Sequence, residues 1–129
     1  MCIAFSFIAS AQTKPVKIVF DVTSSDTLVH QAALRHVSEM AKAYPQSSFE
    51  VVVYGGAMPM FVTGKSTVSK AILKLESNPN VSFKVCEQTM VRYKVDKSQL
   101  VKNVGIVPDG ILEIVNKQAE GWGYIKEAH

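Results

Sequence analysis

The chain is poor in cysteine, with two among its 129 residues. Two thiols cannot form the crosslinks of a disulfide-rich scaffold, so that class of protein is excluded. The chain also lacks an apolar run of the roughly 18 residues that cross a bilayer, which excludes membrane insertion. Its formal net charge is only +3, whereas proteins that bind nucleic acid concentrate many basic residues on one face. We therefore expect no nucleic-acid partner.

The rest of the composition is that of a globular protein. Hydrophobic residues make up 47% of the chain and charged residues 19%, which is ordinary for a folded domain and unlike a disordered segment. A chain of this length buries one core and is too short for two. We predict a single domain over residues 12–129.

The first eleven residues differ from the rest because they carry no charge. They are apolar and end in Ala9, Ser10 and Ala11, the small-residue pattern that signal peptidase cleaves. Residues 1–11 are thus predicted to be a secretory signal peptide that lacks its basic start, and the mature protein to be periplasmic or secreted. The alternative is an apolar arm on a cytoplasmic protein. Cleavage after Ala11 would remove Cys2 and leave Cys86 as the only thiol.

Short β-branched segments alternate with segments of helical periodicity along the chain. This alternation predicts an α/β fold with a mostly parallel sheet of about five strands, covered by helices on both faces. Asp26 is the expected cap of the first helix, and Ser66 or Thr67 that of the second. The expected strands are residues 16–22, 49–54, 81–85, 104–107 and 122–126, and the expected helices are residues 27–44, 67–77, 87–93 and 110–120.

Parallel α/β sheets bind ligands outside the carboxyl ends of their strands. Four loops should meet there, namely residues 23–26, 55–59, 86–89 and 108–110. Asp21, near the end of the first strand, is an acidic residue in an apolar segment. Together these segments supply the candidate pocket residues, which are Asp21, Ser24, Gly55, Gly56, Thr89 and Pro108.

Motifs for metals and cofactors are weak. His30 and His36 are six residues apart on one predicted helix, whereas two zinc ligands on a helix face need a spacing of three or four. We expect both to be surface histidines. The run from Gly64 to Thr67 resembles the end of a phosphate-binding loop. This motif also needs a glycine five positions before Gly64, and Pro59 stands there instead. We expect no metal and no cofactor.

Cys86 is the residue that best fits a chemical role. It follows a predicted strand and precedes a predicted helix, where the positive end of the helix dipole favours a thiolate. The whole basic excess also surrounds it, because residues 84–102 carry a net charge of +3 and the remainder carries none. Glu87 works against the thiolate. The alternative is a buried cysteine that only fills space.

The chain resembles the DsrE/DsrF-like proteins, small sulfur-relay subunits with a YchN-like fold. The resemblance rests on Cys86, on the first strand at residues 20–22, on the strand and turn at residues 50–56, and on residues 107–110 and 117–126. It implies a three-layer α/β/α subunit that assembles into trimers or hexamers. It also implies that Cys86 is catalytic and carries sulfur as a persulfide, received from or passed to a partner protein.

Three functions remain open at this point. The first is a sulfur carrier or sulfurtransferase acting through Cys86. The second is a non-catalytic oligomeric module that binds a small ligand in the loop pocket, and the third is a redox-sensing thiol protein. Residues 58–62 are apolar and lie in a predicted loop, where another subunit should cover them. We therefore expect a homo-oligomer, and we expect Cys86 to be reachable by solvent.

Overall fold

One parallel sheet organises the chain in the computed structural model, which describes residues 14–128. Its strand order is β4-β3-β2-β1-β5, and every neighbouring pair is parallel. This confirms the predicted α/β fold with a five-stranded sheet. The signal peptide predicted over residues 1–11 lies outside the described residues. The strands are β1 (Lys17–Val22), β2 (Ser48–Val53), β3 (Val81–Cys86), β4 (Val104–Val107) and β5 (Gly123–Glu127).

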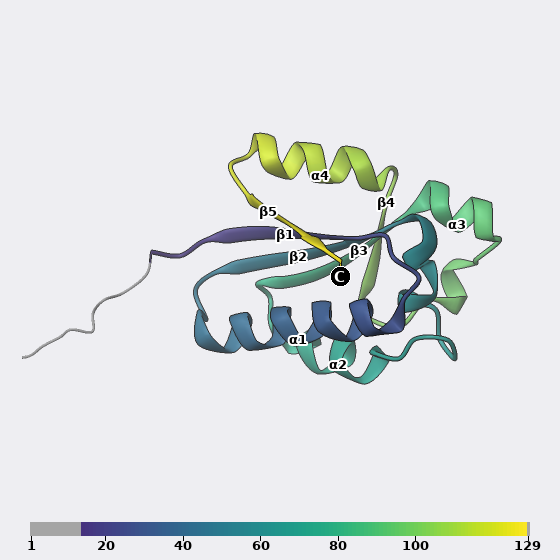
Figure 1. Cartoon of the computed structure of the whole chain (residues 1–129), viewed down its shortest axis with the longest axis horizontal. Coiled ribbons are helices and arrows are strands. Elements are labelled where there is room, and N and C mark those ends of the chain that lie inside the picture. Colours follow the sequence, from purple (N-terminus) through teal and green to yellow (C-terminus); the bar gives the residue numbers. More distant parts are fainter. Residues whose placement is uncertain (1–13, 129) are drawn as a thin grey trace, which may run out of the picture.

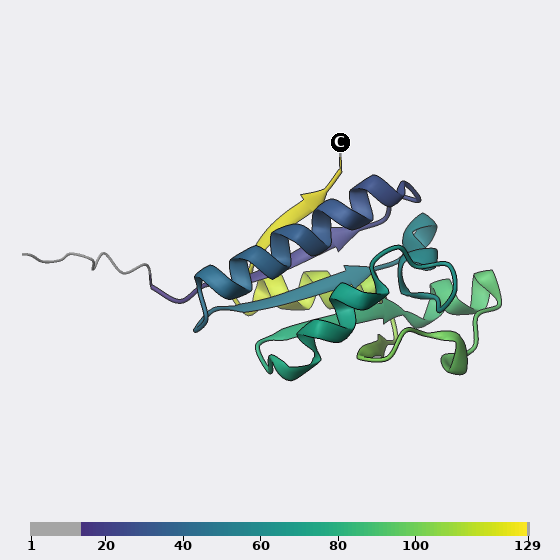
Figure 2. The same cartoon turned by 90° about the horizontal axis from the view of Figure 1, so that it is seen from below.

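The helices form a layer on each side of the sheet, as Figure 1 shows. Helices α1 (Thr27–Ala43) and α2 (Ser69–Lys74) cover one face, and α4 (Gly110–Ala119) lies over the other. Figure 2, seen from below, shows α1 running along the sheet beside α2. The short helix α3 (Glu87–Tyr93) continues from the carboxyl end of β3. The 3-10 helices within residues 14–128 are η2 (Gly55–Phe61), η3 (Leu75–Ser77) and η4 (Lys97–Gln99).

Two aspartates set the starts of the longer helices. The Asp26 carboxylate accepts a hydrogen bond from the Leu28 backbone N–H at 2.8 Å and begins α1, as the sequence predicted. Asp109 caps α4 in the same way. The predicted cap of the second helix was wrong. The Ser66 hydroxyl accepts from the Val68 N–H within a turn, and α2 begins only at Ser69.

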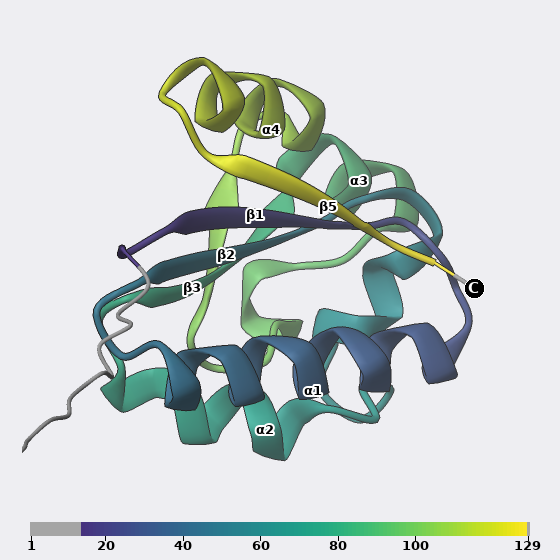
Figure 3. The same cartoon turned by 60° about the vertical axis from the view of Figure 1, so that its left-hand side comes forward.

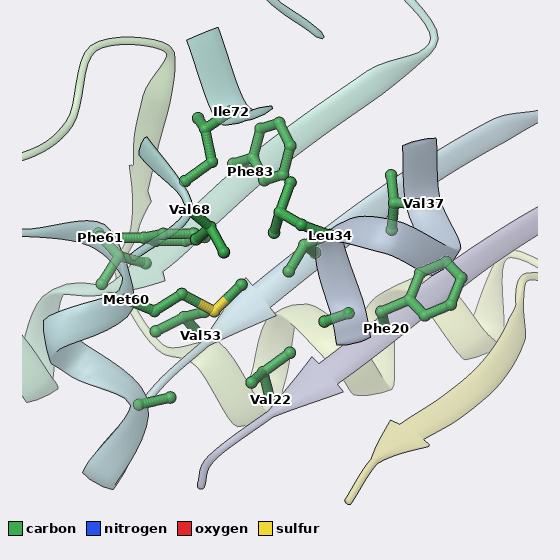
Figure 4. Packing of buried hydrophobic residues seen from close by; sticks show 14 of the residues in the cluster. Phe20, Val22, Leu34, Val37, Val53, Met60, Phe61, Val68, Ile72 and Phe83 are labelled. Carbon is green, nitrogen blue, oxygen red and sulfur yellow. The ribbon is translucent and has the colours of Figure 1, made fainter. Parts of the chain in front are cut away.

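The main hydrophobic core lies between the sheet and the α1 and α2 layer. Strand residues that face this layer, such as Phe20 and Phe83, pack there against α1, α2 and η2 (Figure 4). The expectation that residues 58–62 are an exposed loop was wrong. Met60 and Phe61 have no exposed surface, because η2 folds its apolar side chains back over the core. This segment therefore gives no support to a subunit interface.

The opposite face of the sheet has a much smaller apolar cluster, made of Val19, Val52 and Ile114. Figure 3 shows α4 as the helix that lies along this side. Because side chains alternate between the faces of a strand, Asp21, Glu50 and Cys86 share this face with Val19 and Val52.

The two histidines that were predicted to lie on the surface differ in their burial. His30 is only 1% exposed, so that prediction was wrong for it. Its Nε2 atom donates to the Ser24 carbonyl oxygen at 2.6 Å, which satisfies the ring inside the fold. His36 is about half exposed and pairs with the Glu127 carboxylate at 2.9 Å.

Metal-ligating side chains are dispersed. Within residues 14–128, no three of the His, Cys, Asp and Glu side chains are gathered closely enough to hold a metal ion. In the same range, the helices are all too short or too polar to cross a bilayer.

Candidate functional site

Cys86 is the last residue of β3 and lies directly before α3. Val53 of β2 pairs with Val85 of β3, so Tyr54 and Cys86 follow at the ends of neighbouring strands. Both lie on the face that α4 covers. The start of α4 approaches the same place, since Gly110 is close to both side chains. Cys86 therefore lies where two strand ends and two helix starts meet.

The Cys86 sulfur lies among several hydrogen-bond donors. Burial is the largest single influence on its pKa and raises it, because a buried thiolate loses hydration. Hydrogen bonds from the backbone of Gly110, from the backbone and hydroxyl of Thr89, and from the backbone of Gln88 act in the opposite direction. Together they outweigh burial, and the pKa of Cys86 is lower than that of an ordinary cysteine. The site favours a thiolate at the end of β3.

The Thr89 hydroxyl is held in place by a second contact. It accepts a hydrogen bond from the Gly55 backbone N–H at 3.1 Å and donates its own hydrogen toward the sulfur of Cys86. Gly55 has a φ of +61°, a left-handed conformation that glycine adopts without steric cost. The turn after β2 thereby orients the Thr89 hydroxyl, which follows β3 and donates to Cys86. Two of the predicted pocket residues, Gly55 and Thr89, meet at the thiol in this way.

Gly110 comes very close to the thiol. A Cβ atom added at Gly110 would lie 3.1 Å from the Cβ of Cys86 and 3.2 Å from Cδ1 of Tyr54. This packing leaves Cys86 only 5% exposed, so the prediction that the thiol is reachable by solvent was wrong for the isolated chain. Cys86 does not belong to the main apolar core. It is buried in a cradle of hydrogen-bond donors.

The basic excess around Cys86 in sequence is not what lowers its pKa. The groups that favour its thiolate are backbone N–H groups and the Thr89 hydroxyl. Lys84 is on the same face two residues earlier, but its Nζ atom extends over Gly105 of the neighbouring strand. The helix start proposed from the sequence, that of α3, does act on the sulfur through the Gln88 and Thr89 backbone, whereas the predicted help from lysine or arginine was wrong.

Beside the thiol lies a polar cluster of two tyrosines and a buried aspartate. The Tyr124 hydroxyl donates to Oδ2 of Asp21 at 2.5 Å, and this bond is the main reason that the pKa of Tyr124 is raised to about 12. Lys126 Nζ is 3.5 Å from the same oxygen. Burial, and then the charges of Asp21 and of the Cys86 thiolate, raise the pKa of Tyr54. Tyr54 thus lies within electrostatic reach of both the carboxylate and the thiol.

Oδ1 of Asp21 is the unusual atom of this cluster. Asp21 is 4% exposed, and its Oδ1 atom is buried without a hydrogen-bond partner within the described part of the chain. A buried polar atom without a partner is costly, so such atoms are often kept for a functional reason. Asp21 is the third pocket residue predicted from the sequence that lies at the site.

The other predicted pocket residues contribute less directly. The Ser24 hydroxyl accepts from the Asp26 backbone N–H at 3.0 Å, which uses it within its own loop. Gly56 packs against the same loop, because a Cβ there would lie 3.0 Å from the Thr23 carbonyl oxygen. Pro108 is exposed and precedes the cap of α4. These three residues shape the loops that follow β1, β2 and β4.

A second buried carboxyl lies under α4. Glu50 of β2 is 3% exposed, and its Oε1 atom accepts from the Ser82 hydroxyl at 3.0 Å. Burial raises the pKa of Glu50 most, and Glu113 of α4 raises it further through a hydrogen bond and charge repulsion, to about 7. Ser82 and Lys117, whose Nζ is 3.9 Å from Oε1, oppose this. The packing of α4 on the sheet therefore includes a carboxyl that binds a proton near neutral pH.

Sequence reasoning missed Tyr54, Tyr124 and Gly110 as parts of the site. Tyr54 stands directly before a predicted loop, so the strand-end argument could have included it. Gly110 was placed in a loop at the site, but its close packing against Cys86 depends on the position of α4. Tyr124 reaches Asp21 because β5 pairs with β1, which nothing in the order of the chain specifies.

Comparison with known proteins gives a family and two similar folds. The DsrE/DsrF-like family matches residues 17–126 of the chain. The fold is similar to MTH1491 from Methanobacterium thermoautotrophicum, a protein of unknown function, with a TM-score of 0.79 and 25% sequence identity over 86% of this chain and 98% of that one. It is also similar to the ychN protein from E. coli, with a TM-score of 0.68 and 10% identity over 88% and 99%. No curated protein matches the sequence.

Proposed function

Because the chain belongs to the DsrE/DsrF-like family, which matches residues 17–126, we propose that it carries sulfur as a persulfide on Cys86. The family suggests sulfur relay as the general function. The observation that carries the proposal is the set of donors around the thiol, which lowers the pKa of Cys86 in spite of its burial. A cysteine that only filled space would have no reason to be surrounded by donors.

The chemistry is an exchange of one sulfur atom between thiols. The Cys86 thiolate attacks the outer sulfur of a donor persulfide, a new S–S bond forms, and the donor leaves as a thiolate with the electrons of the broken bond. An acceptor thiolate then attacks the outer sulfur on Cys86 in the same way. No net oxidation occurs, because the outer sulfur moves at a constant oxidation state. This exchange needs no external oxidant and no cofactor.

The donors around Cys86 suit the second half of this exchange. When the acceptor attacks, the Cys86 sulfur leaves as a thiolate, and thiols with a lower pKa leave faster. The hydrogen bonds from Gly110, Thr89 and Gln88 stabilise this leaving group. The same bonds increase the fraction of thiolate that is ready to accept sulfur at neutral pH.

Reagents must reach a thiol that is 5% exposed. The cover at this point is Gly110 at the start of α4, and the two residues before it, Pro108 and Asp109, are exposed. We propose that movement of this short loop admits the donor and the acceptor. Alkylation of Cys86 without denaturant measures this access directly.

The test is the intact mass of the purified protein after incubation with a low-molecular-weight persulfide. Both proteins carry Cys2→Ser, so that Cys86 is the only thiol tested. We expect the protein with Cys86 to gain the mass of one sulfur atom and the Cys86→Ser variant to gain none. Two oxygen atoms of a sulfinic acid have almost the same mass, so a thiol reductant must follow, since it removes a persulfide and leaves a sulfinic acid unchanged. A protein with Cys86 that gains nothing under these conditions contradicts the proposal.

The same measurement separates the other two functions. Reversible gain of one oxygen, or a disulfide with a small thiol, without any persulfide would favour a redox-sensing thiol. A Cys86 that neither alkylates nor gains mass in the folded protein would favour a module that binds a small ligand without catalysis.

We also propose that the protein is a homo-oligomer that associates through α4. Ile111, Leu112 and Val115 lie on one side of this helix and are each more than half exposed, although α4 otherwise packs on the sheet through Ile114. An exposed cluster of this kind on a small domain is typical of an interface. Light scattering should show an assembly at micromolar concentration that Leu112→Glu dissociates. A monomeric wild-type protein would contradict this.

A further inference from the structure

A persulfide places its reacting sulfur beyond the donors that hold Cys86. The outer sulfur lies about 2.05 Å from the cysteine sulfur, at the length of an S–S bond. The hydrogen bonds from Gly110, Thr89 and Gln88 converge on the cysteine sulfur itself. The outer atom carries the negative charge of the persulfide anion, so it needs a donor of its own if the loaded state is to persist.

Most polar groups near the thiol are already used. The Asp109 carboxylate accepts from the backbone N–H groups of Ile111 and Leu112 at 2.9 and 3.1 Å, and a carboxylate cannot donate. The Tyr124 hydroxyl donates its hydrogen to Asp21.

Tyr54 is a neighbouring group with a hydrogen still to give. Its side chain packs beside Cys86 against Gly110, and it is half-buried. Its hydroxyl has no hydrogen-bond partner within residues 14–128. Burial and the nearby charges of Asp21 and Cys86 raise its pKa, so it keeps its proton at neutral pH and can act as a donor.

We propose that Tyr54 binds the outer sulfur of the persulfide, donating a hydrogen bond from its hydroxyl once that sulfur is attached to Cys86. This inference rests on the proposed function. The charge of Asp21, whose Oδ1 has no hydrogen-bond partner within the described part of the chain, also acts on this hydroxyl. Tyr124 holds the other oxygen of the Asp21 carboxylate and thereby limits its competition for Tyr54. Tyr124 is a positioning residue in this arrangement.

The electrons of the transfer do not pass through Tyr54. When an acceptor thiolate attacks the outer sulfur, the electrons of the S–S bond go to the Cys86 sulfur, which leaves as a thiolate. Tyr54 donates a hydrogen bond throughout and keeps its proton. Its contribution exists only in the loaded protein, so it should change how much sulfur the protein holds and leave the acidity of the free thiol unchanged.

The experiment measures the equilibrium loading of Cys86 against a glutathione persulfide and glutathione mixture, by intact mass. We expect Tyr54→Phe to lower the equilibrium constant for loading about tenfold, since a hydrogen bond to a charged group has this order of magnitude. The pH midpoint of Cys86 alkylation should stay at its wild-type position. Tyr93→Phe, at an exposed tyrosine at the end of α3, is the matched control and should load like the wild type.

Tyr124→Phe provides a second measurement that does not depend on the first variant. It removes the shorter of the two contacts that hold Oδ2 of Asp21 and leaves only Lys126 Nζ at 3.5 Å. The carboxylate should then compete more strongly for the Tyr54 hydroxyl, so loading should fall, by less than in Tyr54→Phe. In the double variant the effect of Tyr124→Phe should disappear, because the hydroxyl that it acts on is gone. Additive effects of the two substitutions would overturn the role of Tyr124.

The outcomes separate this inference from the proposed function. If the wild type loads and Tyr54→Phe loads equally well, the inference is wrong and the sulfur carrier stands. If Tyr54→Phe shifts the alkylation midpoint together with loading, Tyr54 acts on the cysteine thiol, and the inference is also wrong. If the wild type itself takes no sulfur, the proposed function has failed.

Discussion

The two faces of the sheet are built differently, although the same five strands form both. One face is sealed by α1, α2 and η2 over a large apolar core that includes Phe20, Phe61 and Phe83. The other is covered by α4 over a small apolar cluster. The second face holds Asp21, Glu50 and Cys86 in buried or nearly buried positions.

The face covered by α1 and α2 therefore provides most of the stability, and the face covered by α4 holds the chemically active groups. A large apolar core supplies most of the free energy of unfolding, and it leaves no room for charges. A face with thin cover can hold carboxyls, phenols and a thiol, because backbone N–H groups and neighbouring side chains bind most of their polar atoms, with Oδ1 of Asp21 as an exception. The buried polar groups of this protein that have unusual pKa values are on the α4 face. Four substitutions can break or sharpen this comparison.

Phe83→Ala should have the largest effect. Phe83 is 1% exposed and packs edge-to-face on Phe61 with ring centroids 6.0 Å apart. Loss of its side chain should lower the free energy of unfolding by about 3–5 kcal/mol, the usual cost of removing a core aromatic residue. Urea unfolding measures it. Val91→Ala on α3, at a position 72% exposed and outside the proposed interface, is the control and should change stability by less than about 0.5 kcal/mol.

Glu50→Gln should increase stability at high pH. The pKa of Glu50 is about 7 in the folded protein against an ordinary value of 4.5. Between these two pH values the folded state keeps a proton that the unfolded state has lost. Stability should therefore fall as pH rises from about 4.5 to 7, by about 3 kcal/mol in total, and stay level above that.

The glutamine variant has no carboxyl at position 50 to titrate, so its free energy of unfolding in urea should change little over this pH range. It should exceed that of the wild type at pH 8 by up to about 3 kcal/mol, and match it near pH 4.5. A wild-type protein whose stability rises between pH 5 and 7 would contradict the raised pKa. It would also show that ionising Glu50 under α4 does not lower the free energy of unfolding.

Gly110→Ala should disturb the thiol cradle with a smaller loss of stability. The new Cβ would meet Cys86 at 3.1 Å and Tyr54 at 3.2 Å, so α4 must shift, at a cost of about 1–3 kcal/mol. The shift lengthens the hydrogen bond from the Gly110 N–H, and the pKa of Cys86 should rise. Gly123→Ala, where the nearest atom is 3.7 Å away, is the control. Equal alkylation profiles for both variants would count against the cradle.

Thr89→Val should have the smallest effect on stability and a specific effect on the thiol. Valine keeps the shape of the side chain but removes the hydroxyl that accepts from Gly55 and donates to Cys86. The substitution should lower the free energy of unfolding by about 1 kcal/mol. The pKa of Cys86 should rise, so alkylation at neutral pH should slow, and Thr89→Ser should restore it. A midpoint that moves down or stays in place would show that the hydroxyl does not stabilise the thiolate.

The alternation of strands and helices was readable from the sequence because each element is defined by a local pattern. The strands are short β-branched runs, and Asp26 is a local cap whose partner is two residues away. Residues 58–62 were misjudged because their apolar side chains form no regular period. Their burial depends on η2 folding back onto the core, which is a long-range contact. His30 was misjudged because its burial comes from the packing of α1 against the rest of the fold, although its hydrogen-bond partner, the Ser24 carbonyl oxygen, is only six residues away.

The sequence by itself determined the α/β class, the position of Cys86 at a strand end and the loops that meet there, because these follow from local patterns and from the common direction of parallel strands. Only the tertiary structure decided which groups act on the thiol. The Gly110 N–H reaches Cys86 because α4 starts against the end of β3, and Tyr124 reaches Asp21 because β5 pairs with β1. Hydrogen bonds and charges act over a few ångströms in space, and no spacing along the chain encodes those distances.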